Sequence, residues 1–178
     1  MNRTQPNQVS NASLHSLDQE FDALFSDGID AFDEHEFARA WAAMGVHRDH
    51  MLINLARKCR YHYRKHKSDQ VMASGSTLVA PSTEDDVDKL TELLNIACEF
   101  AFRYLSKRQI VFFMDALALA FEADMDNFDT FIWVIGGCAA QCQSTSPGRV
   151  EAAVTGVAGV HRHDIERIAE LDTLDKQS

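Results

Sequence analysis

The sequence predicts an all-α protein formed by a single irregular domain of about six to eight helices. Apolar residues recur at three- and four-residue steps along almost the whole chain, which is the spacing of one helix face. No stretch alternates apolar and polar residues for long enough to indicate a half-buried strand. A length of 178 residues, with 46% hydrophobic and 25% charged residues, suits one globular domain. We expect this domain to span residues 13–174, between disordered ends at residues 1–12 and 175–178.

The first two helices are predicted to be short and separated by turn residues. The first begins at residue 13 or 16 and ends near residue 25, because Asp27 and Gly28 follow. The second is capped by Asp33, with Glu36 three residues later to complete a capping box, and it ends at Gly45. The apolar faces of the two helices consist of Leu14, Leu17, Phe21, Leu24 and Phe25, and then of Phe37, Ala40, Trp41 and Met44.

The third and fourth helices are predicted on either side of the longest loop. A helix rich in bases runs from about His47 to about Lys67, and a flexible loop of about residues 68–82 follows, because that segment is small, polar and without periodicity. Ser82 or Thr83 then caps a long helix to about residue 105, whose acidic first turn suits the helix dipole. The inner face of this helix consists of Val87, Leu90, Leu94, Ala97 and Ala101.

The remaining helices are predicted from their start signals. Ser106 and Gln109 form a capping box for a fifth helix, and Asp126 caps a sixth. The Ser-Pro pair at residues 146 and 147 indicates a further start, and residues 164–174 form a last helix. We expect the core to draw on Phe21, Trp41, Leu55, Leu94, Phe113, Leu117, Phe131 and Trp133.

Charge is distributed unevenly along the chain. The formal net charge is −10, yet residues 48–67 hold seven Lys and Arg residues against the single acid Asp49. Residues 13–38 hold eight acids and no Lys or Arg. This asymmetry predicts an acidic or polyanionic partner, or a contact between the two segments within the fold.

The basic helix is the candidate interaction surface, because its bases recur opposite its apolar face of Leu52, Leu55, Ala56 and Cys59. An acidic protein is the favoured partner. Nucleic acid is the alternative, although the net negative charge opposes it. A third interpretation is that the bases are solvated or paired with the acidic N-terminal helices. The predicted binding residues are Arg57, Arg60, Tyr61, Arg64, Lys65 and Lys67.

The same helix carries a candidate metal site. Cys59, His62 and His66 fall within roughly 60° of one another on a helical wheel, and thiolate and imidazole suit zinc or copper. Cys138 and Cys142, one helical turn apart, would supply the two ligands that a structural zinc site still needs. The alternative is that the cysteines are small buried hydrophobic residues, and otherwise we expect no cofactor.

No catalytic motif stands out, so we expect a protein that is not an enzyme. The polar N-terminus lacks a secretory signal, no uncharged stretch is long enough to span a membrane, and the four cysteines lie in helical patterns, which together favour free thiols in the cytoplasm. We expect a cytosolic regulatory or adaptor protein that acts through protein–protein contacts. The alternatives are a nucleic-acid-binding regulator and a metal or redox sensor, and a homo-oligomer stays open.

Overall fold

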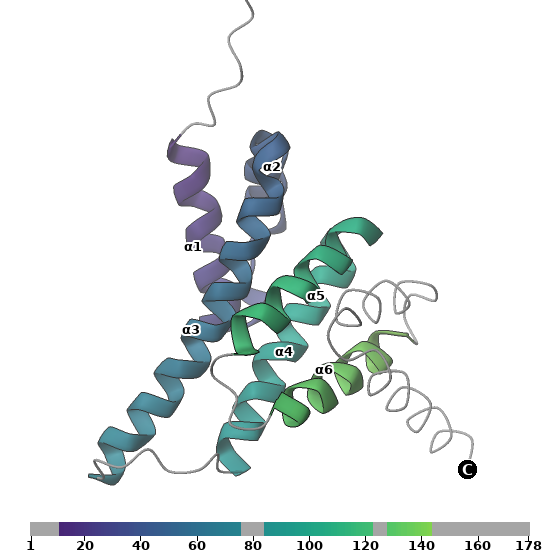
Figure 1. The fold of residues 1–178 in the computed structure, drawn as a ribbon. Helices are drawn as coiled ribbons and strands as arrows, with labels where there is room; N and C mark the ends of the chain where they lie inside the picture. The colour runs from purple at the N-terminus through teal and green to yellow at the C-terminus, as the bar shows by residue number, and fades with distance from the viewer. Residues whose placement is uncertain (1–10, 76–83, 123–127, 144–178) are drawn as a thin grey trace, which may run out of the picture.

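The computed structural model describes residues 11–75, 84–122 and 128–143, and these residues are almost all helical and include no strand, which confirms the all-α prediction (Figure 1). The helix starting near residue 146, the last helix at 164–174, and the caps at Ser82, Thr83 and Asp126 lie outside the described residues. In chain order the elements are α1 (Asn11–Asp27), the 3-10 turn η1 (Ile29–Ala31), α2 (Glu34–Met44), the 3-10 turn η2 (Gly45–His47), α3 (Arg48–Ser74), α4 (Glu84–Tyr104), α5 (Lys107–Glu122) and α6 (Phe128–Gln143).

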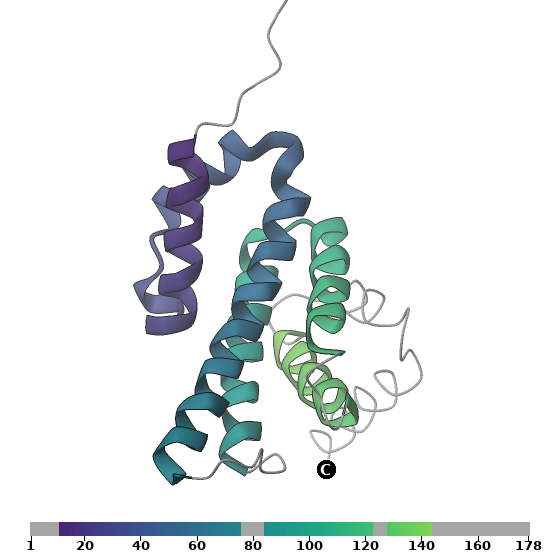
Figure 2. The same cartoon turned by 60° about the vertical axis from the view of Figure 1, so that its left-hand side comes forward.

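The helices α3 and α4 form the centre of the fold and run in opposite directions (Figures 1 and 2). The α1–α2 hairpin packs on one side of this pair, and α5 and α6 pack on the other side (Figure 2). The most extensive contacts join α3 to α5, α4 to α6, α1 to α2 and α3 to α4. Helix α4 runs opposite to both α3 and α5, so α3 and α5 lie side by side and run in the same direction (Figure 2).

The start of α2 is tied to α1 by hydrogen bonds. The Asp33 carboxylate accepts from the backbone N–H groups of His35 and Glu36, both at 2.9 Å, as predicted for the N-cap. In a complete capping box the Glu36 side chain would accept from the Asp33 N–H. Here the acceptor is a residue of α1, because the Asp33 N–H donates to Glu20 Oε2 at 3.1 Å. Glu36 accepts from Ser16 Oγ at 2.5 Å. Only one half of the predicted capping box is therefore formed. The groups that would complete it, the Asp33 N–H and the Glu36 carboxylate, instead form hydrogen bonds to α1.

The predicted capping box at the start of α5 forms in full. The Ser106 N–H donates to Gln109 Oε1 at 3.0 Å, and the Gln109 N–H donates to Ser106 Oγ at 3.4 Å. Two donors that a helix start leaves unpaired are satisfied by neighbouring side chains. The turn between α4 and α5 is consequently short and well defined.

Helix α3 continues to Ser74, past its predicted end near Lys67, so the first part of the predicted loop is helical. Neither Gly nor Pro interrupts residues 68–74, and the side chains of His66 and Gln70 approach to 3.0 Å, one turn apart. The helix ends where Gly75 adopts a left-handed conformation with φ 65°. Composition suggested a loop from residue 68, but the first strong helix breaker in the segment is Gly75.

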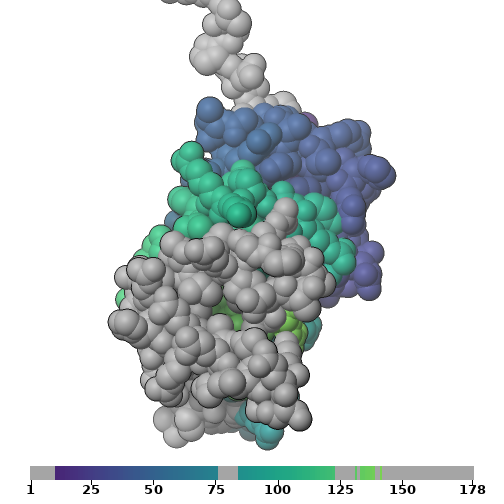
Figure 3. Space-filling model, turned by 90° about the vertical axis from the view of Figure 1, so that its right-hand side faces the viewer, coloured from purple at the N-terminus to yellow at the C-terminus, as the bar shows by residue number. Residues whose placement is uncertain are grey.

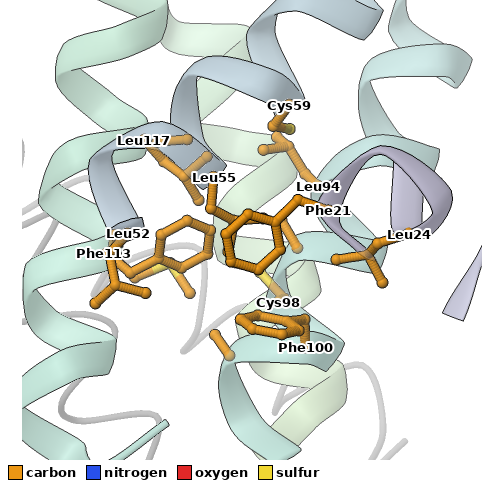
Figure 4. Packing of buried hydrophobic residues seen from close by; sticks show 14 of the residues in the cluster. Phe21, Leu24, Leu52, Leu55, Cys59, Leu94, Cys98, Phe100, Phe113 and Leu117 are labelled. Carbon is orange, nitrogen blue, oxygen red and sulfur yellow. The ribbon is translucent and has the colours of Figure 1, made fainter. Parts of the chain in front are cut away.

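One continuous core joins the helices (Figure 4). Leu52 and Leu55 of α3 lie beside Phe113 of α5, and Phe21 of α1 meets Phe100 of α4 edge to face at 5.9 Å between ring centroids (Figure 4). All the predicted core residues are buried except Trp133, which is 63% exposed. That prediction was wrong because α6 is apolar around most of its circumference, so the sequence does not show which face packs inward.

Among the described residues, none of the helices has both the length and the apolar character needed to cross a membrane.

Candidate interaction surface on helix α3

One flank of α3 is paired with the acidic helix α1. Lys58 Nζ lies 3.2 Å from Asp18 Oδ1 and 2.6 Å from Asp22 Oδ1, and Asn54 Nδ2 donates to Asp18 Oδ1 at 3.1 Å. The Lys58 side chain is only 16% exposed. The predicted contact between the basic and acidic segments is therefore present at Lys58.

Two other bases of α3 stack on aromatic rings. Arg48 donates from Nε to the Trp41 carbonyl at 2.9 Å, and its guanidinium lies 5.7 Å from the centre of the Trp41 ring. The Lys67 ammonium lies 5.8 Å from the centre of the Tyr63 ring. Contacts of this kind stabilise the position of a cation at a partly exposed site. Arg48 and Lys67 thus have partners within the fold.

The second flank of α3 borders a groove with α5, which we call the α3–α5 groove. It has a volume of about 410 Å³ and is open to solvent. Helix α5 lies at the surface as a green band beside the blue residues where α2 ends and α3 begins (Figure 3). The groove is lined by Ile53, Arg57 and Arg60 of α3 and by Phe112, Asp115, Ala116, Leu119 and Ala120 of α5.

The α3–α5 groove combines a cationic edge with an apolar wall. Arg57 is exposed and has no hydrogen-bond or ion-pair partner among the described residues. Leu119 is 61% exposed, and Phe112 is half-buried. Asp115 is the single acid in the lining. Guanidinium groups bind carboxylates through paired hydrogen bonds, so this surface suits a ligand that carries both carboxylates and apolar groups.

The other predicted binding residues divide between the two flanks. Arg64 lies one turn beyond Arg60 and continues the line of Arg57 and Arg60 along the groove side. Lys65 is exposed and lies on the side of the helix that turns toward α1. Tyr61 is also exposed, and it lies at the border of the two flanks, four residues after Arg57 and three before Arg64. Neither Tyr61 nor Lys65 lines the α3–α5 groove.

The groove was missed by sequence reasoning because half of it comes from α5. Leu119 belongs to the segment "ALALAF", in which every residue is apolar. Such a pattern does not reveal which residue stays outside after packing. The signal that could have located the groove was Asp115, the only charged residue between Arg108 and Glu122.

The structure does not bring the predicted metal ligands together. Cys59 is fully buried, and its thiol lies 3.9 Å from the Leu93 carbonyl oxygen. The His62 ring packs at 5.7 Å against Phe25 of α1, whereas His66 Nε2 lies 4.0 Å from Asp86 Oδ1 of α4. Cys59, His62 and His66 share one face of α3, but each lies against a different neighbour, so the three side chains do not form one site. Over the described ranges, no group of three or more His, Cys, Asp or Glu side chains is placed to hold a metal ion.

Cys59, Cys98 and Cys138 are free and buried, whereas the side chain of Cys142 lies outside the described residues. Burial raises the pKa of the Cys59 thiol, and the nearby Cys138 thiol adds to the effect. A thiol held in its neutral form is a poor nucleophile and a poor metal ligand. These three cysteines pack as small hydrophobic residues.

Two partly buried histidines lie where α3 meets its neighbours. Nε2 of His62 is buried and has no hydrogen-bond partner, and burial lowers the pKa of this imidazole. Asp86, in the acidic first turn of α4, is only 3% exposed, and its Oδ1 lies 4.0 Å from His66 Nε2. Protonation of His62 would place a positive charge at the contact between α3 and α1.

A second, smaller hollow of about 200 Å³ lies between α4 and α6. Its lining carries no charged side chain, and Trp133 forms one edge. The residues are Thr91, Asn95, Trp133, Val134, Gly137, Cys138 and Gln141.

No protein-family model matches the chain, and neither a curated protein nor a solved structure matches it.

Proposed function

We propose that this protein is a non-enzymatic regulatory or adaptor protein of the cytosol, and that it binds an acidic partner protein through the α3–α5 groove. The observation that supports this proposal is the placement of Arg57 and Arg60 directly beside the apolar wall that includes Leu119. Protein partners offer carboxylates and apolar side chains together, so they match both parts of the groove.

Nucleic acid matches the groove less well. Phosphate recognition uses bases without needing an apolar wall, and single-stranded nucleic acid adds stacking on aromatic rings. Tyr61, the exposed tyrosine of α3, is not among the residues that line the groove. The net charge of −10 also opposes the approach of a polyanion.

The experiment compares two double variants that change the charge equally. Arg57→Glu with Arg60→Glu reverses the groove, whereas Lys65→Glu with Lys107→Glu reverses two exposed lysines outside its lining. Each tagged protein is used to capture partners from a nuclease-treated extract of the source cells, after its thermal unfolding has been checked. We expect the wild type and the lysine variant to retain the same protein and the arginine variant to lose it.

Two results would contradict the proposal. Equal capture by the arginine variant would place the partner surface outside the α3–α5 groove. Direct binding of DNA or RNA by the wild type, with an affinity that falls steeply as salt is raised and that depends on Arg57, would favour the nucleic-acid alternative.

A further inference from the structure

Helix α1 shows how an acidic helix binds to α3 within this molecule. Its apolar face is fully buried at Leu17, Phe21 and Leu24, and the acids Asp18 and Asp22, one turn apart, both reach Lys58. The apolar face supplies the buried area, while the adjacent carboxylates meet the cation at the edge. Phe21 packs on Phe37 of α2 and Phe100 of α4, so the apolar stripe of α1 is buried in the shared core while its acidic edge pairs with α3.

The groove flank of α3 offers a similar surface, in which a line of cations lies beside apolar residues. Arg57 and Arg60 are three residues apart and Arg64 follows four residues later, so they form a line along the helix. The distance from Ile53 to Arg64 along the axis is roughly 16 Å, at about 1.5 Å per residue, which is the length of three helical turns. Across the groove, Leu119 offers apolar surface that no described segment covers, as its 61% exposure shows.

On the basis of the function proposed above, we propose that the occupant of the α3–α5 groove is an acidic amphipathic helix of a partner protein. Its apolar stripe packs on Phe112 and Leu119, and its carboxylates, spaced three or four residues apart, pair with Arg57 and Arg60. Helix-in-groove recognition uses anchors at these spacings. The line of arginines has the same period, because residues three and four apart share a face of α3.

An extended peptide fits the surface less well. Addition of a peptide as a strand requires the edge of a sheet, and the described part of the chain contains no sheet. A second copy of this chain would have to present its own acidic helix, and the apolar face of α1 is already buried in the fold.

The test uses the full chain and three synthetic peptides of about 16 residues, a length that spans the groove with one turn to spare. The first carries leucines at helical spacing with Asp and Glu beside them. The second has the same composition in an order that abolishes the apolar stripe, and the third has Asn and Gln in place of the acids. Binding is followed by fluorescence anisotropy at physiological salt.

We expect the first peptide to bind, and the second and third to bind at least about tenfold more weakly. Arg57→Glu with Arg60→Glu and, separately, Leu119→Ser should each weaken the first peptide by about tenfold or more, while Lys65→Glu with Lys107→Glu should leave it unchanged. Leu119→Ala serves as a second variant of the wall if Leu119→Ser fails to fold.

The contradicting outcomes separate this inference from the proposed function. Equal binding of the first and second peptides would overturn the helical occupant and leave an acidic partner in place. Absence of peptide binding, together with Arg57-dependent capture of a cellular protein, would do the same. Absence of both would overturn both proposals. An Arg57-dependent dimer of the protein itself would replace the partner helix with a second copy.

Discussion

Lys58 Nζ lies 2.6 Å from Asp22 Oδ1, and this ion pair joins the basic helix α3 to the acidic helix α1. Asp18 approaches the same ammonium group at 3.2 Å, so one cation separates two carboxylates that lie one turn apart. The two carboxylates are about half exposed, at 46% and 52%, so water screens much of their interaction with Lys58.

We expect Lys58→Met to lower the free energy of unfolding by about 1 kcal/mol, because Asp18 and Asp22 then repel each other without a cation between them. Urea denaturation measures the change, and the loss should shrink in 1 M salt. Arg57→Met is the matched control on the groove flank and should shift stability by less than about 0.5 kcal/mol. Equal losses for the two variants would show that Lys58 contributes no specific pairing.

Removal of the N-cap of α5 is expected to lower the free energy of unfolding by more than other substitutions of exposed residues do. Ser106→Ala deletes the hydroxyl that accepts from the Gln109 N–H, and a lost N-cap costs about 1 kcal/mol. Lys107→Ala, one residue away and also exposed, should be close to neutral. Thermal or urea unfolding of both variants tests the difference. A stable Ser106→Ala protein would mean that water replaces the cap.

Two aromatic residues of α6, Phe131 and Trp133, should differ strongly in the cost of truncation. Phe131 is fully buried and stacks on Phe121 at 5.2 Å between ring centroids, so Phe131→Ala should cost about 3 to 5 kcal/mol. Trp133 is 63% exposed, so Trp133→Ala should cost less than about 1 kcal/mol. Chemical denaturation compares the two variants. The reverse order would show that α6 is rotated about its axis.

Stability should fall as the pH is lowered through the range in which His62 would titrate in the unfolded chain. The pKa of His62 is lowered from its ordinary value of 6.5 by burial, and Lys58, Lys65 and Lys89 add to this while Asp22 of α1 opposes it. The unfolded chain therefore binds the proton more readily than the folded protein, and this contribution to stability, present above about pH 6.5, is lost below it.

The control for this pH dependence is His62→Phe, which keeps an aromatic ring against Phe25 but cannot take up a proton. Urea unfolding at pH 7.5 and pH 5.5 should show a smaller loss of stability for this variant than for the wild type. An identical loss in both proteins would assign the pH dependence to other groups.

The buried cysteines are expected to resist modification in the folded protein. Cys59, Cys98 and Cys138 should react with a thiol reagent only after unfolding, because burial excludes the reagent and raises the pKa of Cys59. Peptide mapping by mass spectrometry after labelling with and without denaturant locates the modified residues. Rapid labelling of Cys59 in the folded state would contradict its buried position.

Local patterns in the sequence predicted the elements well, and packing decided the rest. The Ser106–Gln109 capping box could be predicted because both partners lie within one turn. The face of α6 could not, because Phe131 and Trp133 are both large aromatic residues and the positions of α4 and α5 decide which of them is buried. The end of α3 was misplaced because a polar composition was given more weight than the absence of a breaker before Gly75.

The candidate surface was predicted in part. The line of Arg57, Arg60 and Arg64 followed from helical spacing, since these positions share one face of any helix. That Lys58 would turn to α1, and that Leu119 would complete a groove with the arginines, depends on which helices lie against α3. Contacts between residues so far apart in the sequence require the tertiary structure.

The walls of the α3–α5 groove come from helices that are separated by the whole of α4. A fragment that ends before α5 cannot contain the groove, and neither can the unfolded chain. Any occupant is therefore thermodynamically linked to global folding. At a free concentration one hundred times its Kd, it would raise the free energy of unfolding by about 2.7 kcal/mol. A shift in the melting temperature can thus serve as a screen for partners before any of them is known.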